Sequence, residues 1–499
     1  MHAPHLAWLL AAALAAGCAT TTVNNPVSGR AERTVMDEAS ELSEGRKAHE
    51  EVLKETPPLA NPHLQAYVNG VGQRLAAQSH RPGLQWTFTV LDSPEVNAFA
   101  LPGGFVYITR GIMAYLDSEA DMAGVIGHEI GHVTARHGAQ RATRQQSAGL
   151  GVLAASVLGA VLESRGLGGV GQLAGQLGQA AAAGYVARYS REQELQADQL
   201  GAEYLARAKF DPKNMVDVIQ VLKDQDQFRA DQVRAAGRTP QGHNDWLASH
   251  PSSEERLRQI VQHAQGHVGP FSDDGKARYL KAIEGLTFGD SREQGLTRGQ
   301  NFYHEPLGIA LTAPPRWAVQ NGAEAIQLVN AEADAALIVR LVPADAGSTH
   351  EEIIRKLFKP EQGRIEPYAL PSGLRASHFT GARRNAQGQL TNIELTVVSG
   401  PNGRNYLLGY AAKDANALQR ARSGLRDAEA SFRPLSSGDR AAARPWALRS
   451  VPYPGGGFAQ LARTSPLGAQ AEGTLKLING AYGGKLPAPG QLVKVVDAP

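Results

Sequence analysis

The sequence predicts an α+β fold: a mainly helical first domain with a small sheet at its edge, then a small α+β domain and a further small module. Three features predict this class. Apolar residues recur at helical spacing between 122 and 133, short runs rich in bulky or β-branched residues lie at 86–91, 97–100 and 105–109, and the composition changes at 289–298. With 499 residues and 42% apolar content, the chain is long enough for two to four domains.

The N-terminal residues predict export and attachment to a lipid. The apolar run from Leu6 to Ala16 is too short to remain as a membrane span, and Gly17 and Cys18 follow it. The pentapeptide that ends at Cys18, LAAGC, resembles a bacterial lipobox, whose cysteine is acylated and becomes the mature N-terminus. Cys18 is the only cysteine, so it has no partner for an internal disulfide. The alternative is an ordinary secretory signal with an incidental cysteine. Ala19 after the cysteine resembles an outer-membrane address on the periplasmic side.

Polar and charged segments follow the signal. Residues 19–25 are polar and rich in threonine, which predicts a tether. Charged, amphipathic residues predict a helix from Met36 to Leu53. A second helix is expected from Leu64 to Ala77, after a proline-rich break. The three short runs named above then predict a small sheet, with a glycine pair at the turn before the last strand.

Residues suited to metal binding lie in the sequence VIGHEIGHVTAR. On a helix, His128 and His132 lie about 40° apart on one face, so both imidazoles can bind one metal ion, and zinc suits histidine nitrogens at this spacing. Glu129 lies beside them and can accept a proton from an attacking water. Ser118 is the expected N-cap of this helix, and Gly138 can end it. The HExxH pattern is typical of peptide hydrolysis, and the alternative is two histidines on a solvated helix face.

A catalytic zinc needs a third protein ligand. His137 lies nine residues after the first histidine of the motif, on roughly the opposite side of the helix, and is predicted to be a polar residue near the helix end. The sequence YSREQELQAD predicts a second helix that begins with a capping box of Ser190 and Gln193. We assign Glu194 to the metal. Asp198, one turn later, is expected to accept the free N–H of a zinc-bound histidine.

The two segments together resemble metallopeptidase family 48. These gluzincins include the CAAX prenyl proteases and many bacterial periplasmic peptidases, and they share HExxH followed by ExxxD. The similarity extends through NPVSGR, NAFALPGGFVYITRGIMAYL and SHPSSEERL, and so covers roughly residues 24–265. It implies a zinc endopeptidase with one zinc per chain, held by His128, His132 and Glu194, with Glu129 as the catalytic base.

Two neighbouring segments are expected near the metal. In such a peptidase the extended stretch 97–100 borders the cleft and pairs with the substrate backbone, and the alternative is an ordinary hairpin under the helix. His250 precedes a helix that begins near Ser253 or Glu254, in a segment that approaches the metal in related peptidases. Three roles stay open for it: stabilising the oxyanion, occupying the open zinc position in a resting form, or a position in a surface loop.

Residues 147–187, between the two metal-binding helices, are rich in Gly, Ala and Leu. Their longest uncharged stretch is about 15 residues, short of the ~20 that a membrane-spanning helix needs. Small residues four apart favour a helical hairpin packed near the cleft, and the alternative is an interfacial segment that dips into lipid.

Two C-terminal units are expected after the peptidase. Strand-like runs at 336–342, 391–398 and 405–411, with a helix from Ala415 to Ser431, predict an accessory α+β domain that resembles PsbP-like domains. We expect a binding or positioning role for it, because it carries no paired carboxylates or histidines. Residues 445–497 resemble a LysM module of strand, two short helices and strand. Its expected core consists of Phe458, Leu461, Leu475, Leu477, Ile478, Leu492 and Val495.

The whole chain is thus expected to form five segments. Their predicted bounds are 1–17 for the lipoprotein signal peptide, 18–60 for the anchor tether and N-terminal helix, 61–290 for the zinc metallopeptidase domain, 300–435 for the accessory domain and 445–497 for the LysM-like module. A net charge of +2 and the lack of a basic stripe with aromatic residues argue against nucleic-acid binding.

Two functions of different class are consistent with these features. The first is a zinc endopeptidase, anchored by its N-terminal lipid at the periplasmic face of the outer membrane, that acts on unfolded or misassembled envelope proteins. The second is a non-proteolytic periplasmic chaperone or scaffold with a structural zinc, whose C-terminal modules bind partners or peptidoglycan. A structural zinc would have four protein ligands and no open position, which separates the two.

Overall fold

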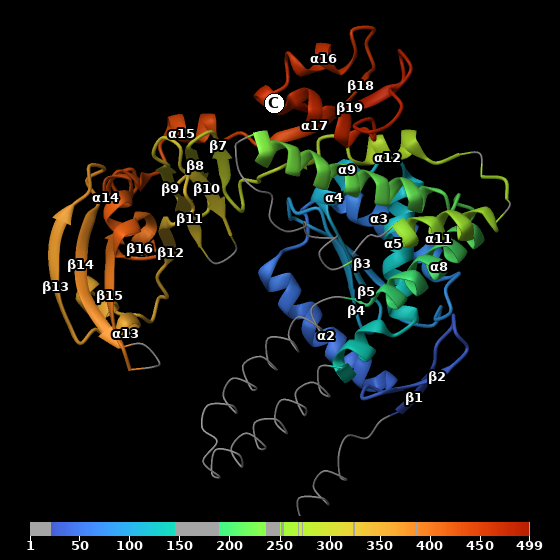
Figure 1. The fold of residues 1–499 in the computed structure, drawn as a ribbon, viewed down its shortest axis with the longest axis horizontal. Coiled ribbons are helices and arrows are strands. Elements are labelled where there is room, and N and C mark those ends of the chain that lie inside the picture. Colours follow the sequence, from blue (N-terminus) through green and yellow to red (C-terminus); the bar gives the residue numbers. More distant parts are fainter. Residues whose placement is uncertain are drawn as a thin grey trace, which may run out of the picture. The chain divides into compact units, whose positions relative to one another are not determined.

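The computed structural model describes residues 21–144, 189–235, 250, 254–267, 269–271, 273–322, 325–384 and 388–498 (Figure 1). The predicted signal peptide with Cys18 and the Gly- and Ala-rich segment 147–187 lie outside these residues. The chain divides into two compact units, which we call unit 1 (Met1–Leu286 with Leu448–Asp497) and unit 2 (Thr287–Ala447 with Ala498–Pro499). Both units mix helices with sheets, in agreement with the α+β class. Within the described ranges, no helix has the length and apolar character needed to cross a membrane.

The first described residues form a two-stranded antiparallel hairpin in place of the expected tether. Thr21–Asn24 (β1) pairs with Ala31–Thr34 (β2). The turn is stabilised by the Asn25 side chain, which accepts hydrogen bonds from the N–H groups of Val27 and Ser28 at 2.9 and 3.1 Å. Because threonine favours extended backbone and asparagine favours turns, this composition encodes a hairpin.

Two helices follow, both close to the expected ranges. Glu38–Glu55 (α2) begins after Asp37, whose side chain accepts a backbone N–H of the first turn at 2.8 Å. Pro62–Ala76 (α3) begins after Asn61, which caps the helix in the same way at 3.1 Å. A proline at the first helical position is favoured because its missing N–H would have no partner there.

A three-stranded sheet forms next, in the order β3–β5–β4. Its strands are Thr87–Leu91 (β3), Ala98–Leu101 (β4) and Phe105–Thr109 (β5). All three agree with the predicted runs to within one residue. β3 runs parallel to β5, and β4 pairs antiparallel with β5 and lies at the edge. Gly103 and Gly104 make the turn between β4 and β5 with φ of 85° and 99°, values that favour glycine.

The helix that carries the HExxH motif, Glu119–Thr134 (α5), is buried along its whole length. Ser118 caps its first turn by accepting a backbone N–H at 3.0 Å, as predicted. The predicted end at Gly138 is wrong, because the helix ends at Thr134 and Arg136 adopts a left-handed conformation with φ of 56°. The Arg136 guanidinium pairs with the buried Glu41 carboxylate at 2.8 Å, which compensates for this backbone conformation.

Further helices of unit 1 pack around α5. Arg191–Arg207 (α8) begins with the expected capping box: Ser190 Oγ accepts from the Gln193 N–H at 3.3 Å, and Gln193 Oε1 accepts from the Ser190 N–H at 3.1 Å. Other helices of this region are Arg110–Tyr115 (α4), Asn214–Ala235 (α9), Glu254–Gln265 (α11) and Lys276–Ala282 (α12), and residues 137–144 are also helical.

The C-terminal segment belongs to the same compact unit as the peptidase region. Its elements are Trp446–Pro452 (β18), Gly457–Ala462 (α16), the 3-10 helix Gly468–Gln470 (η2), Ala471–Ile478 (α17) and Leu492–Asp497 (β19). The expected order of strand, helices and strand is present, and the LysM resemblance stays a prediction. Phe458, Leu475 and Ile478 are buried in this segment, as expected.

One part of the predicted core of this segment is wrong. Leu492 is 43% exposed and Val495 is half-buried. The buried residues of β19 are Val493, Lys494 and Val496. The reason is that Asn479 fixes the register of the strand: its side-chain oxygen accepts from the Lys494 N–H at 2.8 Å and its amide donates to the Lys494 carbonyl at 2.9 Å.

Unit 2 is built on a seven-stranded antiparallel sheet in the order β10–β11–β12–β16–β15–β14–β13. Its strands are Ala318–Asn321 (β10), Ile326–Val329 (β11), Ala335–Leu341 (β12), Gln362–Ala369 (β13), Arg375–Arg384 (β14), Leu390–Ser399 (β15) and Asn405–Ala412 (β16). The expected strands at 336–342, 391–398 and 405–411 correspond to β12, β15 and β16.

Two helices cover opposite faces of this sheet. Ala415–Ala430 (α14) buries Leu425 against Leu408, whereas His350–Phe358 (α13) buries Ile353 in a second cluster that the neighbouring Leu407 joins. Adjacent residues of a strand point to opposite faces, so the two clusters lie on different sides. The other elements of unit 2 are Thr287–Phe288 (β6), Leu296–Arg298 (β7), Asn301–His304 (β8), Ile309–Thr312 (β9), Pro401–Gly403 (η1), Arg433–Pro434 (β17) and Ser437–Ala442 (α15).

Candidate active site

Helices α5 and α8 approach each other closely because small residues line their contact. A Cβ added to Gly131 would lie 2.7 Å from the Ala197 carbonyl oxygen, and one added to Gly201 would lie 3.1 Å from the His128 backbone nitrogen. Bulkier side chains would force the helices apart. The glycine inside the motif is therefore needed to bring α8 side chains over the two motif histidines.

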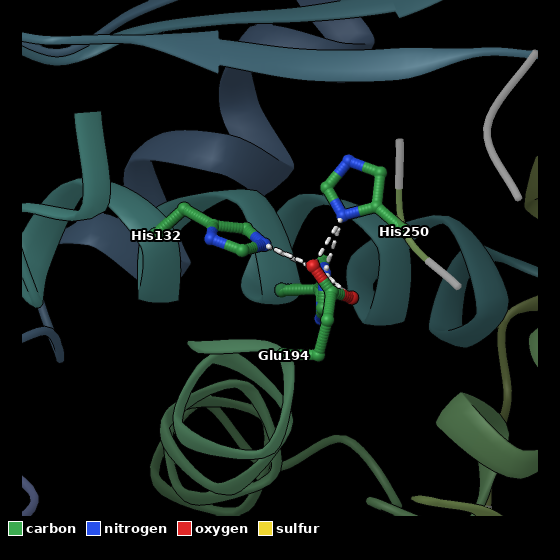
Figure 2. A group of neighbouring side chains, drawn as sticks. His132, Glu194 and His250 are labelled. Carbon is green, nitrogen blue, oxygen red and sulfur yellow. Dashed lines mark hydrogen bonds and ion pairs between the residues drawn. The ribbon is translucent and has the colours of Figure 1, made fainter. Parts of the chain in front are cut away.

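Four buried side chains converge at one point in unit 1. Their ligating atoms all lie within 4.8 Å of one another, and they belong to His128, His132, Glu194 and His250. His128 Nε2 lies 3.0 Å from His132 Nε2 and 3.3 Å from His250 Nδ1. Glu194 Oε1 lies 3.1 Å from His250 Nδ1 and 3.5 Å from His132 Nε2. Figure 2 shows the labelled side chains directed towards one another. The structure thus brings the three predicted ligands together and adds His250 to them.

Asp198 and Arg256 contact residues of this cluster and hold them in place. Asp198 Oδ1 lies 2.8 Å from His128 Nδ1, so the other ring nitrogen faces the cluster. The buried Arg256 donates to Asp198 from Nε at 2.6 Å and from Nη2 at 2.9 Å, and its Nη1 lies 2.8 Å from Glu194 Oε2. Burial raises the pKa of Asp198, but the Arg256 guanidinium outweighs it and holds that pKa below its usual range. Asp198 therefore stays ionised and fixes the His128 ring.

Arg256 was missed from the sequence, although it lies within the quoted segment SHPSSEERL. A signal existed: Glu194 and Asp198 lie one turn apart and both were expected to face the zinc site, and two carboxylates buried together require a compensating cation. Sequence spacing does not indicate which of the 50 Lys and Arg residues supplies it.

His137 supports the second histidine, which corrects the prediction made for it. The His137 ring is buried, and its Nδ1 lies 2.8 Å from His132 Nδ1. Gln196 Oε1 lies 3.1 Å from the other His137 nitrogen. The Tyr189 ring stacks on His132 with centroids 3.9 Å apart. A continuous helix would have placed His137 on the side of α5 that faces away from His128. The helix instead ends at Thr134, and the residues directly after it do not continue it.

Burial sets the protonation of the cluster. Burial lowers the pKa of His128, and it lowers the pKa values of His132 and His250 well below their usual range. The three imidazoles are therefore neutral at physiological pH, which is the form that binds metals. Burial raises the pKa of Glu194 to about 7. A cation beside this carboxylate would favour its ionised form.

The donor set fits one zinc ion. Because His128 Nδ1 faces the Asp198 carboxylate, its Nε2 carries a lone pair, and that nitrogen lies only 3.0 Å from His132 Nε2. His137 Nε2 faces the Gln196 Oε1 acceptor, so His137 Nδ1 accepts from His132 Nδ1 and His132 Nε2 carries a lone pair too. Two nitrogen lone pairs so close together repel each other unless a cation lies between them. Imidazole nitrogens and a carboxylate are the usual donors to catalytic zinc, which keeps one further position open.

Glu129 and the edge strand border the cluster. Glu129 is buried on α5, with Oε1 3.7 Å from His250 Nε2. Ala100 of β4 lines the same small cavity as His132. The edge strand thus lies next to the cluster, as expected. Its pairing with a substrate stays a prediction.

A buried HExxH helix with a glutamate supplied by a second helix defines the zincin class of metallopeptidases. Residues 62–264 match the model of Peptidase family M48. This part of the chain is similar to that family of metallopeptidases, which agrees with the resemblance seen in the sequence.

The chain is also similar to several named proteins. Over 206 residues the chain is 32% identical to the beta-barrel assembly-enhancing protease of Yersinia pestis, and the match covers 40% of this chain and 39% of that protein. It is 32% identical over 213 residues to the protein of the same name from Escherichia coli (strain K12), covering 41% and 40%. It is 30% identical over 187 residues to the mitochondrial metalloendopeptidase OMA1 of Arabidopsis thaliana, covering 38% and 33%. The chain therefore spans less than half the length of these relatives.

The solved structures that show some similarity include a PsbP protein. The solution structure of cyanobacterial PsbP from Synechocystis sp. PCC 6803 covers 28% of this chain and 98% of that chain, with 13% identity and a TM-score of 0.21. This TM-score is too low to assign the fold of the accessory domain.

Proposed function

We propose that this chain is a zinc-dependent endopeptidase that hydrolyses unfolded or misassembled proteins of the bacterial cell envelope. The observation that carries the proposal is the convergence of His128, His132 and Glu194 at one buried point, with Glu129 on the same helix. The family M48 match over residues 62–264 supports the same reaction.

Each residue has a distinct task in this reaction. His128, His132 and Glu194 would hold the zinc ion, which when bound supplies Lewis-acid polarisation of the scissile carbonyl. Glu129 accepts a proton from the attacking water and then donates it to the departing amine. Asp198 orients the His128 ring, which keeps its ligating nitrogen directed at the cluster.

The edge position of β4 supports a peptide substrate. Among the described strands β4 lies at the edge of its sheet, and an extended chain can add to this edge through main-chain hydrogen bonds, which place its backbone beside the cluster. Main-chain pairing depends little on side chains. This favours unfolded segments of varied sequence over folded proteins, whose backbone groups are already paired.

Other features support the proposed location of the protein in the cell, its substrates and its partners. The LAAGC sequence supports lipid attachment at Cys18 and a place at the periplasmic face of the outer membrane. The names of the bacterial relatives refer to the assembly of β-barrels, which supports envelope proteins as substrates. The LysM resemblance of residues 445–497 supports peptidoglycan as a further partner.

His250 is proposed to occupy the open metal position in a resting form of the enzyme. Its Nδ1 lies 3.3 Å from His128 Nε2 and 3.1 Å from Glu194 Oε1, among the ligating atoms themselves. A group in that position has to move before a substrate can enter. Such a contact would spare folded neighbouring proteins. The competing role is that of an oxyanion donor.

The same four residues support the alternative function. If His250 were a permanent fourth ligand, the zinc would be structural, and the chain would act as a chaperone or scaffold without peptidase activity. A structural site has no open position, so bound zinc would not be accompanied by hydrolysis.

Metal removal and casein hydrolysis separate the two functions. The full chain is stripped of metal with a chelator, zinc is restored in steps, and casein degradation is followed beside the zinc content. We expect activity to disappear with the metal and to return at one zinc per chain. Tight binding of one zinc by a folded chain that never degrades casein would instead establish the scaffold. Envelope proteins trapped by the Glu129→Gln variant would then identify substrates.

A further inference from the structure

The C-terminal segment 448–497 packs onto the peptidase region through several close contacts within unit 1. Leu448 exchanges backbone hydrogen bonds with the segment that follows α12, donating to the Leu286 carbonyl and accepting from the Gly285 N–H, both at 2.9 Å. The Tyr482 ring packs edge-on against Phe228 of α9 with centroids 5.3 Å apart. These contacts hold the segment against α9 and against the chain that follows α12, and both helices also pack on α5.

A fully buried lysine lies at the centre of this packing. Lys494 of β19 is 0% exposed, and its Nζ donates to the Leu116 carbonyl at the C-cap of α4. Its Nζ also lies 3.8 Å from Asp117 Oδ1. Within the described residues, no group donates a hydrogen bond to Asp117 Oδ1. Lys494 and Lys276 supply the positive charge around the Asp117 carboxylate.

The residues that Lys494 contacts form the junction between α4 and α5. Ser118 caps α5, and the Asp117 N–H donates to Asp121 Oδ2 at 3.0 Å. The Asn214 amide donates to Asp121 Oδ1 at 2.6 Å. The junction is therefore held by hydrogen bonds from α9 as well as by the lysine from β19.

The energetics argue for a positioning role. Removing an ammonium group from water costs free energy that an apolar residue of similar size would not cost, so a buried lysine is a poor choice for stability alone. It does supply a directed hydrogen bond and a charge. Ser118 lies ten residues before His128, about 15 Å along the helix axis, and a helix transmits displacement of its end along its length.

We propose that residues 448–497 are an obligatory part of the peptidase unit, and that Lys494 is a positioning residue that fixes the α4–α5 junction and thereby the helix bearing His128, Glu129 and His132. The catalytic part of this inference rests on the proposed function. The structural coupling does not, because it follows from the contacts of Lys494 alone.

The test compares Lys494→Met with Lys494→Arg and with the control Lys485→Met, which changes an exposed lysine of the same segment. Hydrogen exchange is measured at the backbone amides of residues 117–122, together with zinc content, kcat and KM on an unfolded substrate. For Lys494→Met we expect faster exchange at these amides, full zinc content, an unchanged KM and a kcat roughly 10- to 100-fold lower. Lys494→Arg should restore part of the kcat, and Lys485→Met should match wild type.

The possible outcomes are distinguishable. Wild-type exchange and kcat in Lys494→Met would overturn the proposal, and so would a lower melting temperature with unchanged kcat, since that is a structural role only. If Lys494→Met does not fold, Asp117→Asn decides, because this partly exposed side chain faces the same lysine. It must then show the same faster exchange and lower kcat. If the wild-type chain has no peptidase activity, the proposed function fails, and exchange at 117–122 still decides whether β19 holds α5.

Discussion

The two ends of helix α5 are held in different ways. Towards its C-terminal end, His128 and His132 meet a carboxylate from α8 and their second ring nitrogens are fixed by buried partners. At its N-terminal end, the helix is fixed by a lysine from β19 and an asparagine from α9. The first end binds metal through a short motif, whereas the second depends on residues scattered through the sequence. Substitutions at the first end should therefore remove metal and activity while the fold persists, and those at the second should weaken the helix while metal is kept.

Removal of the third ligand should have the largest effect. Glu194→Ala is expected to weaken zinc binding beyond the roughly 10- to 100-fold loss typical of residues that only orient a ligand. Activity should vanish with the metal, while far-UV circular dichroism stays that of wild type. A competition titration with a chromogenic chelator measures the affinity. Zinc binding of wild-type strength would show that the carboxylate is not a ligand.

His250→Ala should reveal which role this residue plays, because the two roles predict opposite changes. An oxyanion donor would lower kcat by ~10² when removed, with binding little changed. The proposed resting-state contact would instead raise the turnover of a flexible substrate. Steady-state kinetics on an unfolded protein give the answer. Unchanged kinetics would exclude both roles.

Asp198→Ala should weaken zinc binding less than Glu194→Ala does, by roughly 10- to 100-fold. The reason is that Asp198 contacts the His128 ring and not the metal position. The same chelator titration applies, with zinc content checked at saturating metal. If Asp198→Ala lost more zinc than Glu194→Ala, the roles of the two carboxylates would be reversed.

The smallest expected effect is the pH dependence of stability that comes from Lys494, which lies at the N-terminal end of α5. Burial lowers the pKa of Lys494 to about 8 in the folded protein, where Asp117, Asp121 and Lys276 are the charged groups around it. An unfolded lysine titrates near ~10.4, so between these values the unfolded chain binds more protons, and the free energy of unfolding rises with pH by up to about 3 kcal/mol. Urea unfolding at pH 8 and pH 10 should show this rise in wild type and not in Lys494→Met. If the free energy of unfolding changed equally with pH in both proteins, this would contradict the lowered pKa of the buried Lys494 amine.

The sequence predicted the parts of the molecule that depend on local pattern. The three strands of the first sheet, the Ser118 cap and the capping box at Ser190 were found at the expected positions, because turns, caps and period-two runs are local properties. The shared direction of His128 and His132 followed from their helical spacing, whereas Glu194, on a separate helix, was predicted from the ExxxD pattern that resembles family 48.

Tertiary contacts decided what the sequence did not predict. The end of α5 depends on the Arg136 pair with Glu41, and the role of His137 depends on that end. Arg256 and Lys494 are charged residues that any pattern places on the surface, and both are fully buried because their partners come from distant elements. Partners of this kind are set by packing, which sequence periodicity does not contain.

The central claim is that Glu129 performs the proton transfer in a zinc site made by His128, His132 and Glu194. The most direct measurement is the hydrolysis rate of Glu129→Gln at a verified content of one zinc per chain. The amide keeps the shape of the side chain but has no basic oxygen to accept the proton, so we predict full zinc binding, a wild-type fold and loss of nearly all activity. Substantial hydrolysis by the zinc-loaded variant would contradict the account.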